Sequence, residues 1–188
     1  MDTYNLTTAT ELQQAVHTIK TAILKSQSRA ARLISGTQLS LYFGVGLYVS
    51  SNSRKGTWGT GAIEDISNQL RRELPGLKGF SAQNIRNMRQ FAEFWQTYLI
   101  YSPMASKMEV ADLQHEIEYD RFSLAKWSPM ASEINRDEFL GISFSHHMEI
   151  LHKTKKIDEV LHCIHETVIH QWDKYTLRDV LKIGIPQP

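Results

Sequence analysis

The stretch from Gly79 to Phe91, GFSAQNIRNMRQF, holds the side chains of this chain that are best suited to contact a nucleic acid. It contains two asparagines, two glutamines and two arginines, and no carboxylate lies between Lys78 and Phe91. Arginine forms paired hydrogen bonds with guanine, and asparagine or glutamine forms them with adenine. Because an ordinary exposed helix mixes charges of both signs, this composition favours a surface that contacts a polyanion.

A helical wheel divides this stretch into a core face and a contact face. Ile85, Met88, Phe91, Ala92 and Trp95 share one side of the helix, which predicts that they face the core. Recognition helices reach base edges with their N-terminal turns, while neighbouring cations contact phosphates. The candidate DNA-contacting residues are therefore Gln83, Arg86, Asn87, Arg89 and Gln90, with Lys78, Arg71 and Arg72 as candidate phosphate contacts.

The charge of the chain is spread unevenly, although its net value is only +1. From Asn52 to Gln90 seven basic residues oppose three acidic ones, which leaves a net +4. From Lys107 to Leu140 four basic residues oppose eight acidic ones, which leaves a net −4. The basic segment is suited to face a polyanion, and the alternative is that the two segments attract each other within one fold.

Two helices predicted within residues 60–99 have the layout of a helix-turn-helix. The first has Thr60 as its candidate N-cap, carries an apolar stripe from Ile63 to Leu74, and is stopped by Pro75 and Gly76. The second begins at Ser81 and runs to about Leu99. The alternative is that the two helices only pack against each other, as most pairs of helices joined by a turn do.

Helical spacing of apolar residues dominates the rest of the sequence and predicts a mainly α, compact multi-helix domain. The stretch LSLYFGVGLYVSS suits a buried helix, which we favour, or a strand, so a small β-hairpin stays open. We expect an N-terminal helix at residues 1–27, a main domain at 28–182 with a candidate acidic insertion at 104–140, and a tail at 183–188.

Hydroxyl residues that follow an aromatic residue are candidate helix N-caps. The pairs Phe80-Ser81, Phe144-Ser145 and Tyr175-Thr176 have this form. The hydroxyl oxygen of an N-cap accepts a hydrogen bond from a free backbone N–H in the first turn. The pattern therefore predicts a chain of helices with strong start signals.

Catalytic and metal chemistry have little support in the sequence. His165 and His170 are five residues apart, whereas a zincin needs a spacing of four so that both imidazoles share a helical face. None of the 20 acidic residues has a lysine two positions later, as a metal-dependent nuclease of the restriction type requires. Cys163 lies in an amphipathic helix and is expected to be packed. We expect no enzyme activity, no metal and no cofactor.

Several stretches together resemble the N-terminal domain of the bacterial YhcG-like proteins. They are LYFGVGLYVS, WGTGAIEDISNQL and LPGLKGFSAQNIRNMRQF, followed by ISFSHHMEIL and IHQWDKYTLRDVL. The resemblance covers about residues 28–182 and is specific in its middle. There the signature falls on Pro75, Gly76, Gly79, Phe80, Ser81, Asn84, Ile85, Met88, Arg89 and Phe91.

The resemblance implies a mostly helical DNA-binding module, which in that family usually precedes a nuclease domain of the PD-(D/E)xK type. Such a domain is absent from this sequence, which ends at GIPQP. We therefore expect a non-catalytic module that binds, or is targeted to, duplex DNA in a nuclease-associated system.

The alternative is a protein-interaction or oligomerisation module that forms a homodimer or recruits a separate nuclease. Trp58, Trp127 and Trp172 are candidate anchors for such an interface, because aromatic residues are enriched at binding hot spots. No apolar run reaches the 18 residues typical of a membrane span, so no membrane partner is expected. A single cysteine suits a reducing compartment, and we expect a cytoplasmic location.

Overall fold

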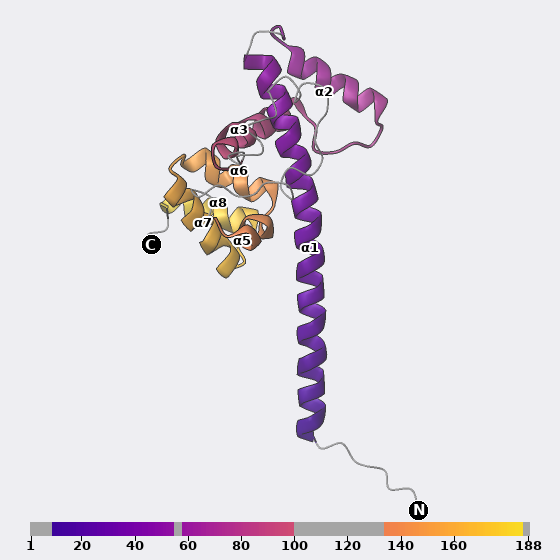
Figure 1. Cartoon of the computed structure of the whole chain (residues 1–188), viewed down its shortest axis with the longest axis vertical. Coiled ribbons are helices and arrows are strands. Elements are labelled where there is room, and N and C mark those ends of the chain that lie inside the picture. Colours follow the sequence, from indigo (N-terminus) through magenta and orange to yellow (C-terminus); the bar gives the residue numbers. More distant parts are fainter. Residues whose placement is uncertain (1–8, 55–57, 100–133, 186–188) are drawn as a thin grey trace, which may run out of the picture.

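The computed structural model describes residues 9–54, 58–99 and 134–185, which fold into seven α-helices without a β-strand (Figure 1). The prediction of a mainly α domain is therefore confirmed. The stretch LSLYFGVGLYVSS, for which a hairpin stayed open, lies within a helix. The helices are α1 (Ala9–Arg54), α2 (Ala62–Glu73), α3 (Ala82–Leu99), α5 (Arg136–Gly141), α6 (Phe144–Lys153), α7 (Ile157–Ile169) and α8 (Lys174–Ile183).

Helix α1 is 46 residues long and has two parts with different surroundings. Residues 9–34, called the arm below, extend beyond all the other helices, as Figure 1 shows, and most of their described side chains are exposed. Residues 35–54, called the packed segment below, bury Leu39, Phe43 and Val49 almost completely. One continuous helix thus supplies both a core element and a projection from it.

The packed segment and α3 cross closely at Gly46. A Cβ atom at this position would lie 2.1 Å from the backbone oxygen of Met88 and 2.7 Å from the Cβ atom of Ala92. Glycine alone allows the two helix backbones to come this near. The face of α3 predicted to be core is buried at this crossing and beyond it, which confirms the wheel: Ile85, Met88, Phe91, Ala92 and Trp95 are each 1% exposed or less.

The helices α5 to α8 complete the same core around the ring of Phe91. Phe144 meets this ring edge to face at a centroid distance of 5.4 Å, and Phe139 lies 6.4 Å from it. His147 is fully buried beside both, and its Nε2–H donates to the carbonyl oxygen of Phe139 at 3.0 Å. Burial lowers the pKa of His147 to about 3, so the imidazole is neutral in the folded protein.

The predicted N-cap is confirmed at one of the three aromatic-hydroxyl pairs. The Ser81 hydroxyl accepts from the backbone N–H of Asn84 at 3.2 Å. The prediction is wrong at α6, where Ser143 caps the helix and the aromatic residue follows the cap. It is also wrong at α8, where Asp173 accepts from the backbone N–H of Thr176 at 2.7 Å. A carboxylate or hydroxyl one turn earlier satisfies the same free N–H groups, so the aromatic residue does not set the register.

Only some of the predicted segment boundaries fall on residues that the structure describes. Helix α1 continues without a break past residue 27, where an N-terminal helix was expected to end. The candidate insertion at 104–140 lies mostly outside the described residues, and its last residues begin α5.

Candidate nucleic-acid interface

The segment that joins α2 to α3 fixes how α3 begins. Gly79 has a φ of +87°, and a Cβ atom there would lie 2.6 Å from the Tyr42 hydroxyl oxygen, so both its conformation and its surroundings require glycine. The side-chain amide of Asn84 donates back to the carbonyl oxygen of Gly79. These contacts, with the Ser81 cap, hold the first turn of α3 against the packed segment.

Helix α2 is held to the same place by its apolar face and one buried hydroxyl. Ile63 is buried in a small cluster with Val49 and Ile85, and this cluster joins α2 to both α1 and α3. The Ser67 hydroxyl donates to the carbonyl oxygen of Phe80 at 2.8 Å. The eight residues between the two helices exceed the 3–4-residue turn typical of a helix-turn-helix, so the connection differs from that motif.

Two details of the predicted first helix are wrong. The cap is Gly61 in a left-handed conformation, and no side chain caps α2, so Thr60 does not have that role. Leu74, predicted at the end of the apolar stripe, is 52% exposed. The exposure of Leu74 follows from the helix ending at Glu73, because Leu74 is then turned out of the helical register.

Arg86 does not lie free on the outer face of α3. Its Nη2 forms an ion pair with Oε1 of Glu64 in the first turn of α2, and its side chain is 34% exposed. The hydrogen bond from this guanidinium holds the pKa of Glu64 below its usual range. Arg86 thus ties α3 to α2, and its charge is largely matched within the protein.

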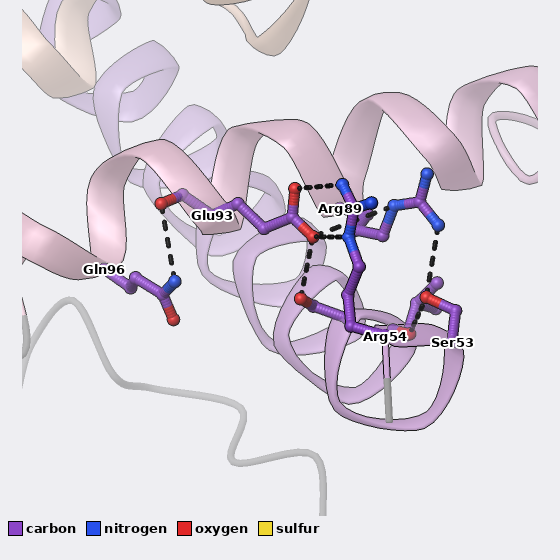
Figure 2. Close-up of polar contacts among 7 residues, drawn as sticks. Ser53, Arg54, Arg89, Glu93 and Gln96 are labelled. Atoms are coloured by element: carbon purple, nitrogen blue, oxygen red, sulfur yellow. Dashed lines mark hydrogen bonds and ion pairs between the residues drawn. The ribbon is translucent and has the colours of Figure 1, made fainter. Parts of the chain in front are cut away.

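Arg89 is turned towards the end of α1, as Figure 2 shows. Its Nη1 donates to the Ser53 hydroxyl at 3.1 Å, and its Nε lies 3.9 Å from Oε1 of Glu93. Arg54 binds the same carboxylate with two hydrogen bonds of 2.9 and 3.1 Å (Figure 2). With 20% of its side chain exposed, Arg89 belongs to a cluster that joins α1 to α3.

Glu93 is the centre of this cluster. Its Oε1 also accepts a hydrogen bond from the Ser50 hydroxyl at 2.8 Å. Burial raises the pKa of Glu93, but the hydrogen bonds from Arg54 and Ser50 outweigh that effect, and its pKa lies below the usual value. The carboxylate is therefore ionised and neutralises the cations around it.

The remaining candidate contact residues stay on the surface. Gln83 and Gln90 are exposed, and Asn87 is half-buried and accepts a hydrogen bond from the Gln83 amide at 3.1 Å. Arg71, Arg72 and Lys78 are exposed at the end of α2 and in the connecting segment. The structure thus leaves three amides and three cations available, and gives the two arginines of α3 structural partners.

Sequence reasoning missed the partners of those arginines and a larger apolar surface. Glu64 lies one helix earlier, so spacing within α3 does not reveal it as the partner of Arg86. Glu93 lies four residues after Arg89, and that spacing within α3 does indicate their ion pair. The arm exposes large apolar residues, and at its end Leu33 and Ile34 line a groove with Lys78 and Phe80. The sequence signal for this apolar surface was the row of apolar residues along the arm, for which no other predicted helix served as a packing partner.

The aromatic residues proposed as interface anchors are not open where the structure describes them. Trp58 is partly buried against Tyr48 at a centroid distance of 5.7 Å. Trp172 packs on the main core and stacks on His170 at 5.2 Å. Trp127 lies outside the described residues.

The histidines and Cys163 were the remaining candidates for metal binding or nucleophilic chemistry. No set of three His, Cys, Asp or Glu side chains among those residues is placed to hold a metal ion. Cys163 is buried, and burial raises the pKa of its thiol to about 11, which disfavours the reactive thiolate. Among the same residues, no helix combines the length and the apolar character needed to cross a membrane.

The fold and the surface around α3 define an all-helical module with a polar, carboxylate-poor helix face. A family model described as the DUF1016 N-terminal domain matches residues 18–185. The chain therefore belongs to this family, which confirms its resemblance to the N-terminal domain of the YhcG-like proteins. No match was found among curated proteins or among solved structures.

Proposed function

We propose that this protein is a non-catalytic DNA-binding module whose contact surface consists of α3 and the end of α2. The observation that carries the proposal is a run of exposed cations beside a helix face without carboxylates. Arg71, Arg72 and Lys78 lead along the chain to Gln83 and Gln90, and all five are exposed. Cations of this kind bind phosphates, and the amides are suited to base edges.

The contacts of Arg86 and Arg89 assign these two residues to the scaffold of the surface. Arg86 holds α3 to α2 through Glu64, and Arg89 holds α3 to α1 through Ser53. Reversing their charge would disturb the fold as well as any contact with DNA. A binding test is therefore sharper with Arg71, Arg72 and Lys78.

The test measures binding to duplex DNA at several salt concentrations for the whole chain and two double variants. Arg71→Ala with Arg72→Ala removes two proposed phosphate contacts. Lys153→Ala with Lys182→Ala removes two exposed charges on α6 and α8 and serves as the matched control. We expect the first variant to bind more weakly and to lower the slope of log K against log salt by about 2, because each phosphate contact contributes about 0.9.

Two results would contradict the proposal. One is that the unaltered chain does not bind duplex DNA even at low salt. The other is that the control variant loses as much affinity as the variant of α2, which would indicate nonspecific attraction to the whole protein. A further variant, Gln83→Ala with Gln90→Ala, tests base contacts, and we expect it to change sequence preference while leaving the salt slope unchanged.

A protein-interaction module is the second candidate, and the exposed apolar surface of the arm favours it. Val16, Ile19, Ile23 and Leu33 are each more than half exposed. Apolar patches of this size on a protein surface mark interaction sites. A nuclease-associated setting suits either candidate, since the YhcG-like family usually joins this domain to a nuclease.

A further inference from the structure

We propose that the arm of α1 pairs with the arm of a second copy of this chain as a parallel, two-stranded coiled coil. The inference names a partner for the interaction surface and does not rest on the DNA-binding proposal. It starts from exposure: Val16 is 56% exposed, Ile19 59%, Ile23 51% and Leu33 69%. Figure 1 shows most of the arm standing clear of the other described helices.

The apolar residues of the arm follow a heptad repeat. Counting from Leu12 as position d, the a positions hold Val16, Ile23 and Ala30, and the next d positions hold Ile19, Ser26 and Leu33. Six of these seven positions are apolar. The a and d residues form a continuous row, called the seam below, because the repeat averages 3.5 residues. The seam stays in contact with a partner helix that has the same repeat, and a second copy of this chain is such a partner.

The residues at the seam favour two parallel chains. β-branched residues at the a positions, here Val16 and Ile23, with Leu33 at a d position, favour two strands over three or four in a parallel coiled coil. In a parallel register each residue meets its own copy, so Ser26 meets Ser26 and its hydroxyls have a hydrogen-bonding partner. Ala30 likewise meets Ala30, so a small side chain of one helix faces the same small side chain of the other.

The body of each copy lies on the side of α1 away from the seam. Ile23 and Phe43 are 20 residues apart, which at 3.6 residues per turn places them about 200° apart around the helix. Phe43 points into the core. Two copies joined along the Ile23 side therefore carry their bodies on opposite outer sides, where they do not collide.

The charges of the arm do not oppose this pairing. Lys20 is at position e and Arg29 at position g, while Lys25 is on the outer side. In a parallel pair a g residue faces the e residue of the next heptad in the partner. Lys20 then faces Ala15 and Arg29 faces Ile34, so no two like charges are placed together.

The exposed area is sufficient for a specific pair. Five large apolar side chains at or beside the seam are each more than half exposed: Val16, Ile19, Ile23, Leu33 and Ile34. Together they offer on the order of 500 Å² per chain, and two copies reach the roughly 1,000 Å² that a specific interface needs.

The first test measures the mass of the full chain in solution by light scattering, without DNA. We expect twice the chain mass of 21.6 kDa. Ile19→Glu with Ile23→Glu places charges in the seam and is expected to give a monomer. His17→Glu with Thr21→Glu adds the same number of acidic residues on the outer side and is expected to stay dimeric. Circular dichroism of both variants checks that the body remains folded.

The second test uses oxidation to determine the register. In a Cys163→Ala background, Ser26→Cys is expected to form a disulfide between copies, because both cysteines lie at the same level of the seam. Thr21→Cys, on the opposite side of the helix, is the matched control and is expected to remain reduced.

The possible outcomes separate this inference from the DNA-binding proposal. A monomer, trimer or tetramer mass for the unaltered chain would overturn the dimer, as would a dimer that survives charges in the seam. Equal cross-linking at positions 26 and 21 would overturn the parallel seam. Loss of DNA binding alone changes none of these masses.

Discussion

The arm and the packed segment belong to one helix, but they bury their apolar residues in different ways. In the packed segment Leu39, Phe43 and Val49 are 2% exposed or less. In the arm Val16, Ile19 and Ile23 have similar spacing and are more than half exposed. The difference is that Gly46 lets α3 approach the packed segment, whereas no described helix crosses the arm. An amphipathic stripe therefore predicts that a face will be covered, but it does not say by which chain.

The largest expected difference between the two regions concerns the core. Phe91→Ala removes a ring that contacts Phe43, Phe139 and Phe144, and we expect it to lower the free energy of unfolding by about 3–5 kcal/mol. Leu24→Ala, in the arm and off the seam, is expected to change it by less than about 0.5 kcal/mol. Urea unfolding measures both. A comparable loss for Leu24→Ala would mean that the arm is packed within one chain.

Two glycines of α1 provide a sharper version of this comparison. Gly46→Ala would press a Cβ atom against the backbone of α3, and we expect a loss of about 3 kcal/mol. Gly36→Ala would place its Cβ atom in ordinary contact with Leu140, at 3.6 Å, and is expected to gain up to about 1 kcal/mol from helix propensity. Thermal and urea unfolding should give the two variants opposite signs. The same sign for both would contradict the close crossing at Gly46.

Acid is expected to weaken the buried region through His147. The pKa of His147 is about 3 in the folded protein against an ordinary 6.5, so between these values the unfolded chain binds a proton that the folded chain does not. Stability therefore falls as pH drops through this window, by on the order of 2 kcal/mol at about pH 5.

His147→Gln keeps an N–H donor and removes the titration, and serves as the control. It should unfold more easily at neutral pH, but with a flatter pH dependence of the free energy of unfolding. A slope as steep as that of the unaltered chain would show that other groups, such as Glu93, determine the acid response.

The smallest effect is expected at the end of the packed segment. Glu93→Gln weakens the ion pairs with Arg54 and Arg89, and we expect a loss of about 1 kcal/mol, since Arg54 is largely exposed to solvent. Because the pKa of Glu93 is lowered, this contribution is present at neutral pH and disappears on acidification. Glu64→Gln, at the more exposed pair with Arg86, is the control and should lower the midpoint of urea unfolding less than Glu93→Gln does.

Much of the fold was predictable because local periodicity and local capping decide it. The core face of α3, the break at Pro75 and Gly76, and the Ser81 cap all follow from residues a few positions apart. The caps of α6 and α8 were less predictable, because Ser143 and Asp173 competed with nearby hydroxyls for the same free N–H groups. Local rules therefore set the type of each helix better than its first residue.

The sequence by itself determined a mainly α-helical fold, its family and a carboxylate-free stretch from Lys78 to Phe91. Tertiary structure alone decided which of those polar residues remain available. The packed helices bring Arg86 to Glu64 of α2 and Arg89 to Ser53 of α1, so both guanidinium groups are held within the protein. Contacts between helices depend on distances between atoms that spacing along one helix does not contain. The same is true of the arm, whose exposed stripe is known only after every other described helix has taken its place.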